Sequence, residues 1–161
     1  MILPSDEAGQ GRPVVLLHAR PVDRTMWRGH LPLLAQAGVR AIALDLPGHG
    51  DVAAAQRAEV APWADVLDTL DHLGADRFTL AGVAADPLTK DGGALRTLPT
   101  PTLVGVGEFD MPDFFEGGAV LSNELGSGEV AVLADAGHLA PLEQPEAFCA
   151  PLLDFVGRLP A

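Results

Sequence analysis

Short apolar runs alternate with helical patterns along nearly the whole chain, and this alternation constrains the fold more than any other feature. Five runs have the composition of strands buried on both faces, at residues 14–18, 41–46, 78–83, 102–106 and 130–133. Helical patterns follow them at residues 24–37, 61–73 and 145–159, with a less regular one within 113–125. Repeated strand–helix–strand units predict an α/β fold, with a doubly wound, mostly parallel sheet and helices on both faces.

Composition narrows the classes of protein and ligand. The chain has 161 residues, 48% of them hydrophobic, which suits one domain over residues 1–161. A net charge of −12 would repel nucleic acid, so we expect no such partner. Cys149 is the single cysteine and no ligand cluster has metal spacing, so we expect no disulfide, metal or cofactor. Without a basic leader or a long apolar stretch, we expect a cytoplasmic protein with no membrane contact.

Glycine-rich and polar segments follow the five runs, and α/β proteins bind ligands at the carboxyl edge of a parallel sheet. These segments read His-Ala-Arg-Pro at 18–21, Asp-Leu-Pro-Gly-His-Gly at 45–50, Gly-Glu-Phe-Asp at 107–110 and Gly-His at 137–138, the last followed by Pro-Leu-Glu-Gln-Pro-Glu at 141–146. In this order they resemble the motifs of the α/β-hydrolase family, over nearly the whole length of the chain. The resemblance implies a shortened α/β-hydrolase fold.

The resemblance also assigns roles to two residues. Asp110 matches the acid of the family's catalytic triad, and His138 matches its base. In such a pair the carboxylate holds the imidazole tautomer and stabilises the imidazolium that forms when the ring takes a proton. The resemblance therefore implies that Asp110 and His138 are catalytic residues.

The nucleophile is where the chain departs from the family. The family carries a serine in a Gly-x-Ser-x-Gly turn after the third strand. Residues 82–86 read Gly-Val-Ala-Ala-Asp, which places Ala84 at the serine position and Asp86 two residues too late to replace it. Ser5, Ser122, Ser127 and Cys149 lie elsewhere in the sequence. We therefore expect no covalent intermediate and no serine-hydrolase activity.

A deletion follows the same turn. Only 18 positions separate Ala84 from Thr102, where the family normally has a helix, a further strand and a lid. The sheet then shortens to five strands in the order 2-1-3-4-5, with the runs numbered along the chain. Loss of the lid implies a wide, wet site that suits a bulky substrate, and the exposed sheet edge suggests a homodimer.

The oxyanion site also differs, because the family's His-Gly is His18-Ala19 here. Its backbone donors would be the N–H groups of Arg20 and Ala85, and the Arg20 cation could bind an enolate or carboxylate. His18 has the alternative role of ordering the loop after the first strand. Trp27 either packs in the core or lines the pocket, or it serves as a stacking platform for a ligand. The candidate oxyanion and substrate-binding residues are thus Arg20, Ala85, Ala84, His18 and Trp27.

Three functions remain open. The first is a cofactor-free enzyme in which His138 and Asp110 perform acid–base chemistry of the lyase, cyclase or isomerase type on a carbonyl-containing small molecule. The second is an inactive relative of hydrolases that binds a ligand or a partner. The third is an ester hydrolase altered by truncation and by a Ser→Ala change.

Overall fold

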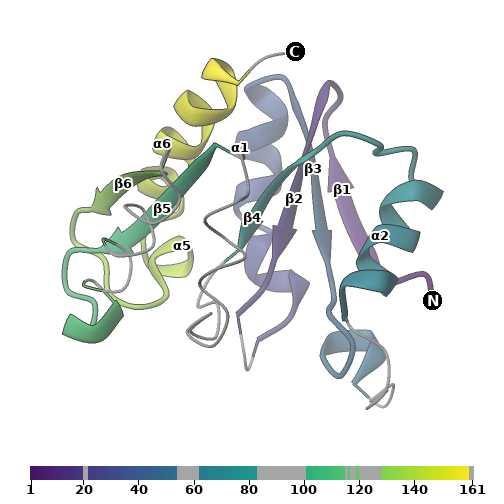
Figure 1. Ribbon diagram of the computed structural model, residues 1–161, viewed down its shortest axis with the longest axis horizontal. Helices are drawn as coiled ribbons and strands as arrows, with labels where there is room; N and C mark the ends of the chain where they lie inside the picture. Colours follow the sequence, from purple (N-terminus) through teal and green to yellow (C-terminus); the bar gives the residue numbers. More distant parts are fainter. Residues whose placement is uncertain are drawn as a thin grey trace. The chain divides into compact units, whose positions relative to one another are not determined.

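The computed structural model describes residues 1–19, 22–53, 62–82, 101–114, 116, 119 and 128–159. They belong to two compact units, Met1–Val83 and Ala84–Ala161, and each unit is described by itself (Figure 1). Strands alternate with helices in the first unit, and two parallel strands precede two helices in the second, which agrees with the predicted α/β class. The single domain predicted for residues 1–161 stays a prediction.

The first unit holds a four-stranded sheet in the order β1-β3-β2-β4. Its strands are β1 (Ser5–Ala8), β2 (Arg12–Leu17), β3 (Val39–Leu44) and β4 (Thr79–Gly82). The parallel neighbours β3, β2 and β4 are the second, first and third predicted runs, in the order expected for them.

Strand β1 was missed by the sequence analysis. It is antiparallel to β3, with Ser5 opposite Leu44 and Ala8 opposite Ala41. Its sequence Ser-Asp-Glu-Ala carries no apolar alternation, so only backbone pairing at the sheet edge reveals it. Gly9 has φ +82°, and a Cβ there would lie 2.3 Å from the Val39 carbonyl oxygen, so the turn after β1 requires glycine.

The helix predicted over residues 24–37 is wrong in its continuity. The structure instead has a 3₁₀ helix, η1 (Arg24–Trp27), and a separate helix, α1 (His30–Gln36). Pro32 explains the break, because its ring nitrogen cannot donate to the carbonyl of Arg28 in one continuous helix. Proline is tolerated in the first turn of a helix that starts at His30, where the N–H groups have no intrahelical partner.

The core of the first unit lies on both faces of β2 and β3. Val15, Leu17, Ile42 and Leu44 share one face and cluster with Val66, Leu70 and other residues around helix α2 (Pro62–His72). Val14, Leu16, Ala41 and Ala43 alternate with them and are also fully buried. Helix α1 contacts β3. Figure 1 shows α1 behind the strands of this sheet and α2 at the right, beside β1.

The second unit contains two parallel strands, β5 (Thr102–Gly107) and β6 (Gly128–Leu133), in register from Thr102 opposite Gly128 to Gly107 opposite Leu133. These are the fourth and fifth predicted runs, and they are neighbours as expected. The pairing of the third run with the fourth is not described, so the full order 2-1-3-4-5 stays a prediction.

Two helices follow β6, the short α5 (Ala140–Glu143) and the longer α6 (Pro145–Arg158). Helix α6 confirms the pattern at 145–159 and buries Cys149, Leu152, Phe155 and Val156. The pattern within 113–125 lies mostly outside the described residues. None of the helices described is both long enough and apolar enough to cross a bilayer.

Candidate active site

Asp110 and His138 follow the two strands of the second unit and meet at their carboxyl ends. The His138 Nδ1 lies 3.0 Å from the Asp110 Oδ1, which also accepts the Met111 N–H at 2.8 Å. The Asp110 side chain is 7% exposed and that of His138 is 31% exposed. Because an ionised carboxylate only accepts, Nδ1 carries the proton of neutral His138 and Nε2 presents a lone pair. This arrangement is suited to accepting a proton at Nε2.

The two loops that carry the pair are joined through their backbones. The N–H of Phe109 donates to the Ala136 carbonyl at 2.9 Å, and the N–H of Glu108 donates to that of Leu133 at 2.9 Å. A Cβ at position 107 would lie 2.2 Å from the Gly137 carbonyl oxygen. Glycine is therefore required at position 107 so that the two loops approach closely enough for the pair to form.

Residues beyond the pair also hold the His138 loop. The Phe114 ring lies 4.3 Å from the His138 ring, centre to centre. Glu143 accepts from the N–H groups of Gly137 at 2.8 Å and Leu139 at 3.0 Å, one on each side of His138. Sequence reasoning quoted Glu143 within a motif but assigned it no role, and it missed Phe114. The spacing of Glu143 five residues after the histidine was the available signal.

The surroundings of the pair are apolar and acidic. Phe109 is 69% exposed and Met111 is 50% exposed, directly on either side of Asp110. The sequence from 101 to 157 contains no Lys or Arg, whereas acidic side chains recur throughout it. Within this segment the side chains beside the pair are therefore apolar or acidic, which favours a ligand with an apolar part.

The His18 side chain is buried, and both of its ring nitrogens lie within hydrogen-bond distance of backbone groups. It is 4% exposed, and its Nε2 accepts the Leu46 N–H at 2.9 Å. Nδ1 must then carry the proton, and it lies 3.0 Å from the Ala19 carbonyl oxygen. Burial lowers the pKa of His18 and outweighs the hydrogen bond to Ala19, which acts to raise it. Both ring nitrogens are occupied, so His18 orders the loops after β2 and β3 and offers no free atom to a substrate.

The Asp-x-Pro-Gly-x-Gly segment forms a buried ionic network. Asp45 is 0% exposed, pairs with the Arg24 guanidinium and accepts the N–H groups of Arg24 at 2.8 Å and Asp51 at 2.9 Å. Burial acts to lower the pKa of Arg24, but its bonds to Asp51, Asp45 and Asp6 raise it overall. Gly50 has φ +51°, and a Cβ there would lie 2.1 Å from the Asp45 Oδ2. This motif therefore serves the structure of the first unit.

Trp27 is 0% exposed and packs edge-on against His30, with ring centres 4.9 Å apart. This burial favours the core among the alternatives for Trp27, and its role in substrate binding stays a prediction. Arg20, Ala84 and Ala85 lie outside the described residues. Their proposed oxyanion and substrate-binding roles therefore stay predictions.

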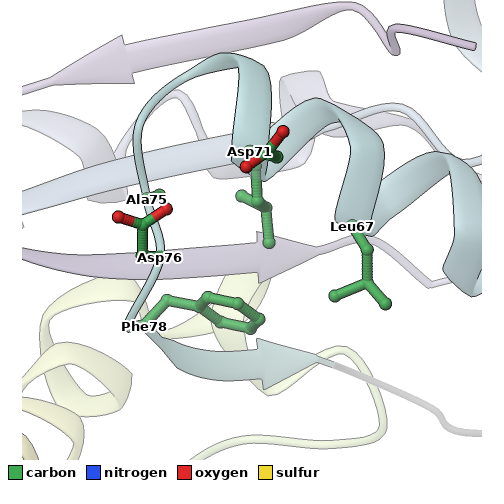
Figure 2. Close-up of a pocket in the computed structure, with 6 residues that line it drawn as sticks. Leu67, Asp71, Ala75, Asp76 and Phe78 are labelled. Atoms are coloured by element: carbon green, nitrogen blue, oxygen red, sulfur yellow. The ribbon is translucent and has the colours of Figure 1, made fainter.

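The first unit also contains a pocket. It is lined by Leu67, Leu70, Asp71, Ala75, Asp76 and Phe78. Figure 2 shows the Leu67 side chain and the Phe78 ring extending beside the helix that carries Leu67. Phe78 directly precedes β4, so the pocket lies at the amino end of that strand, opposite the edge where α/β proteins bind ligands.

Neither a metal site nor a reactive thiol is supported by the part of the chain that the structure describes. That part has no group of three His, Cys, Asp or Glu side chains placed to hold a metal ion. Cys149 is buried, and burial raises the pKa of its thiol to about 11. The thiolate is the reactive form, so this cysteine is a poor nucleophile near neutral pH.

Comparison with known proteins decides the family. The profile of the alpha/beta hydrolase family matches residues 14–85. Mouse protein ABHD14A is 30% identical over an alignment of 190 residues that covers 99% of this chain and 75% of the mouse protein. The chain belongs to the α/β-hydrolase family. This confirms the family suggested by the sequence motifs.

Two further relatives of this α/β-hydrolase chain are informative. Human "Putative protein-lysine deacylase ABHD14B" is 33% identical, and the alignment covers 94% of this chain and 87% of the human protein. A thermophilic esterase from Thermogutta terrifontis superposes with a TM-score of 0.79 at 21% identity, covering 97% of this chain and 93% of the esterase, which shows the shared fold. The alignment with ABHD14A is longer than this chain, so the mouse protein carries residues with no counterpart here.

Proposed function

We propose that this α/β-hydrolase relative is a cofactor-free enzyme that moves protons on a carbonyl-containing small molecule, with His138 as the base and Asp110 as its partner. One observation carries the proposal: the Nδ1 of His138 is held by Asp110 at 3.0 Å while the ring remains 31% exposed. A neutral imidazole held in this way presents the lone pair of Nε2, which can accept a proton.

Each step uses groups of this chain. The Nε2 of His138 removes a proton from carbon next to the carbonyl, and Asp110 stabilises the imidazolium that results. In an isomerisation the imidazolium returns the proton to a different atom of the resulting enolate. In an elimination the bond from the β carbon to the leaving group breaks, and the imidazolium protonates that group. In a ring closure the enolate carbon bonds to a second carbonyl carbon of the same molecule, and the imidazolium protonates the oxygen of that carbonyl. Acid–base transfer of this kind contributes about 10²–10⁴-fold to a rate, which suits an activated substrate. The apolar side chains beside the pair favour a substrate with an apolar part.

The test is proton exchange in D₂O. Neutral aryl ketones would be incubated with the full chain, and loss of the α-proton signal would be followed by NMR. We expect His138→Ala to lower the exchange rate by about 10²-fold or more. His72→Ala is the matched control, because His72 is an exposed histidine at the end of α2 and should leave the rate unchanged. Equal rates in the parent and in His138→Ala would overturn the proposal in favour of a binding protein.

The altered ester hydrolase is a second candidate, favoured by the names of the relatives, a deacylase and an esterase. It predicts that restoring serine by Ala84→Ser creates a nucleophile that His138 can activate. Stoichiometric labelling of Ala84→Ser by a fluorophosphonate, lost again in the double variant with His138→Ala, would support it. Absence of labelling in a folded Ala84→Ser protein would leave the acid–base enzyme as the better account.

A further inference from the structure

One carboxylate accepts hydrogen bonds from both neighbours of the proposed base. The Glu143 Oε2 accepts the Gly137 N–H at 2.8 Å, and its Oε1 accepts the Leu139 N–H at 3.0 Å. These two peptide groups flank His138 in the chain. Fixing both of them restricts the backbone torsions that decide where the imidazole of His138 lies.

The local sequence explains why a glutamate performs this task. Helix α5 begins at Ala140, and Leu139 at its N-cap position has no side chain that can accept from the first N–H groups. Glu143, at the end of the same short helix, folds back and accepts from the N-cap residue itself, as the glutamate of a capping box does. Glu143 also accepts from the N–H of Gly137, which lies two residues before the N-cap residue.

Gly137 is matched to this contact. A Cβ at position 137 would lie 3.2 Å from both carboxylate oxygens of Glu143. That distance is shorter than ordinary van der Waals contact, so any larger residue would push the carboxylate away. The glycine before the histidine thus permits the approach of Glu143.

We infer that Glu143 is a positioning residue for His138: it holds the loop so that Nδ1 reaches Asp110 and Nε2 stays open. This inference rests on the proposed function of the His138–Asp110 pair and adds a residue to it. This positioning role requires that both carboxylate oxygens of Glu143 accept a hydrogen bond. A glutamine offers only one acceptor, and its NH₂ group would meet the second backbone N–H.

The experiment reads the tautomer of His138 directly. The full chain would be labelled with ¹⁵N, and the imidazole nitrogens of His138 would be observed by NMR at a pH where the ring is neutral. In the parent protein we expect the Nδ1–H tautomer, because Asp110 accepts from it. Free imidazole side chains favour Nε2–H in water, so loosening of the loop should raise that form.

Three variants make the readout specific. Glu143→Ala and Glu143→Gln should each lower the Nδ1–H fraction, by about two-fold or more in the alanine variant, which loses both acceptors. Glu146→Gln removes the same charge from the first turn of α6 and should leave the tautomer unchanged. Gly137→Ala presses on the carboxylate without deleting it, and it should shift the tautomer in the same direction even if Glu143→Ala does not fold.

The outcomes separate the two ideas. A parent protein in which His138 already favours Nε2–H would overturn the pair and the proposed function together. A parent with Nδ1–H whose folded Glu143→Gln and Gly137→Ala variants keep the parent's tautomer ratio would overturn the role of Glu143 alone. A shift in both variants with no shift in Glu146→Gln would support it.

Discussion

His18 follows β2 in the first unit and His138 follows β6 in the second, and each lies after a strand whose parallel neighbour is followed by an aspartate. The two histidines differ in what occupies their Nε2 atoms. His18 accepts the Leu46 N–H and is 4% exposed. Among the residues that the structure describes, His138 forms its hydrogen bond through Nδ1 to Asp110, and it is 31% exposed. The two aspartates differ too, because Asp45 binds Arg24 and backbone N–H groups rather than histidine.

The comparison teaches that residue type and place at a strand end are not enough to define a catalytic group. In the first unit, burial and complete hydrogen bonding turn a histidine and an aspartate into structural parts. In the second, His138 is partly exposed, and no described residue forms a hydrogen bond with its Nε2, which is the arrangement that the proposed base requires. From this difference between the two pairs we predict that substitutions of His18 or Asp45 lower the stability of the fold. The matched substitutions of His138 or Asp110 should instead lower the rate of the proposed reaction.

We expect the largest loss of stability on substitution of the buried carboxylate of Asp45. Asp45→Asn leaves the Arg24 guanidinium without its buried partner, and breaking such a pair costs about 3 kcal/mol of unfolding free energy. Asp110→Asn should cost only about 1 kcal/mol, since its partner His138 remains partly exposed. Urea unfolding of both variants measures the difference. Equal losses of stability would break the comparison between the two units.

We expect the second-largest loss of stability on substitution of two glycines, Gly50 and Gly107, at which a Cβ would contact neighbouring atoms. Gly50→Ala forces a Cβ against the Asp45 carboxylate at positive φ, and Gly107→Ala forces one against the Gly137 carbonyl. Each should lower the unfolding free energy by about 2 kcal/mol. Only Gly107→Ala should also shift the His138 tautomer, because it displaces the loop that carries this ring. An unchanged His138 imidazole spectrum in Gly107→Ala would mean that the close approach is not what forms the pair.

The smallest effect is the pH dependence that His18 contributes. Burial lowers its pKa below the ordinary value of 6.5, so the folded state binds this proton less readily than the unfolded state. The stabilisation that His18 contributes to the folded state is fully present above pH 6.5. It is lost as the pH falls below 6.5, and the unfolding free energy then decreases by no more than about 1.4 kcal/mol per pH unit. Asp23, whose pKa is lowered by bonds from Thr25, acts in a separate window below 3.8.

The measurement is thermal unfolding of the parent and of His18→Ala between pH 7 and pH 5. The stability of the variant should fall less over this range than that of the parent, although the variant is less stable at pH 7 because Leu46 loses its acceptor. A parallel fall in His18→Ala and the parent would show that His18 does not carry this dependence.

Much of the fold was predictable because the runs that became β2, β3, β5 and β6 are mostly apolar. The expectation of burial on both faces holds for β2 and β3, whereas Val130 and Val132 of β6 are exposed. The polar edge strand β1 was not predictable, since backbone hydrogen bonds to β3 define it and its side chains carry no pattern. The division of the predicted helix into η1 and α1 was foreseeable from Pro32, which sequence reasoning did not use.

The sequence by itself determined the class of fold, the family and the pairing candidates Asp110 and His138, because these depend on the order of local patterns along the chain. Only the tertiary structure decided that His18 is occupied, that Trp27 is buried and that Glu143 holds both sides of His138. The physical reason is that hydrogen-bond occupancy and burial depend on groups from other strands and loops. A residue's own neighbours in the sequence do not reveal which of its atoms remain free.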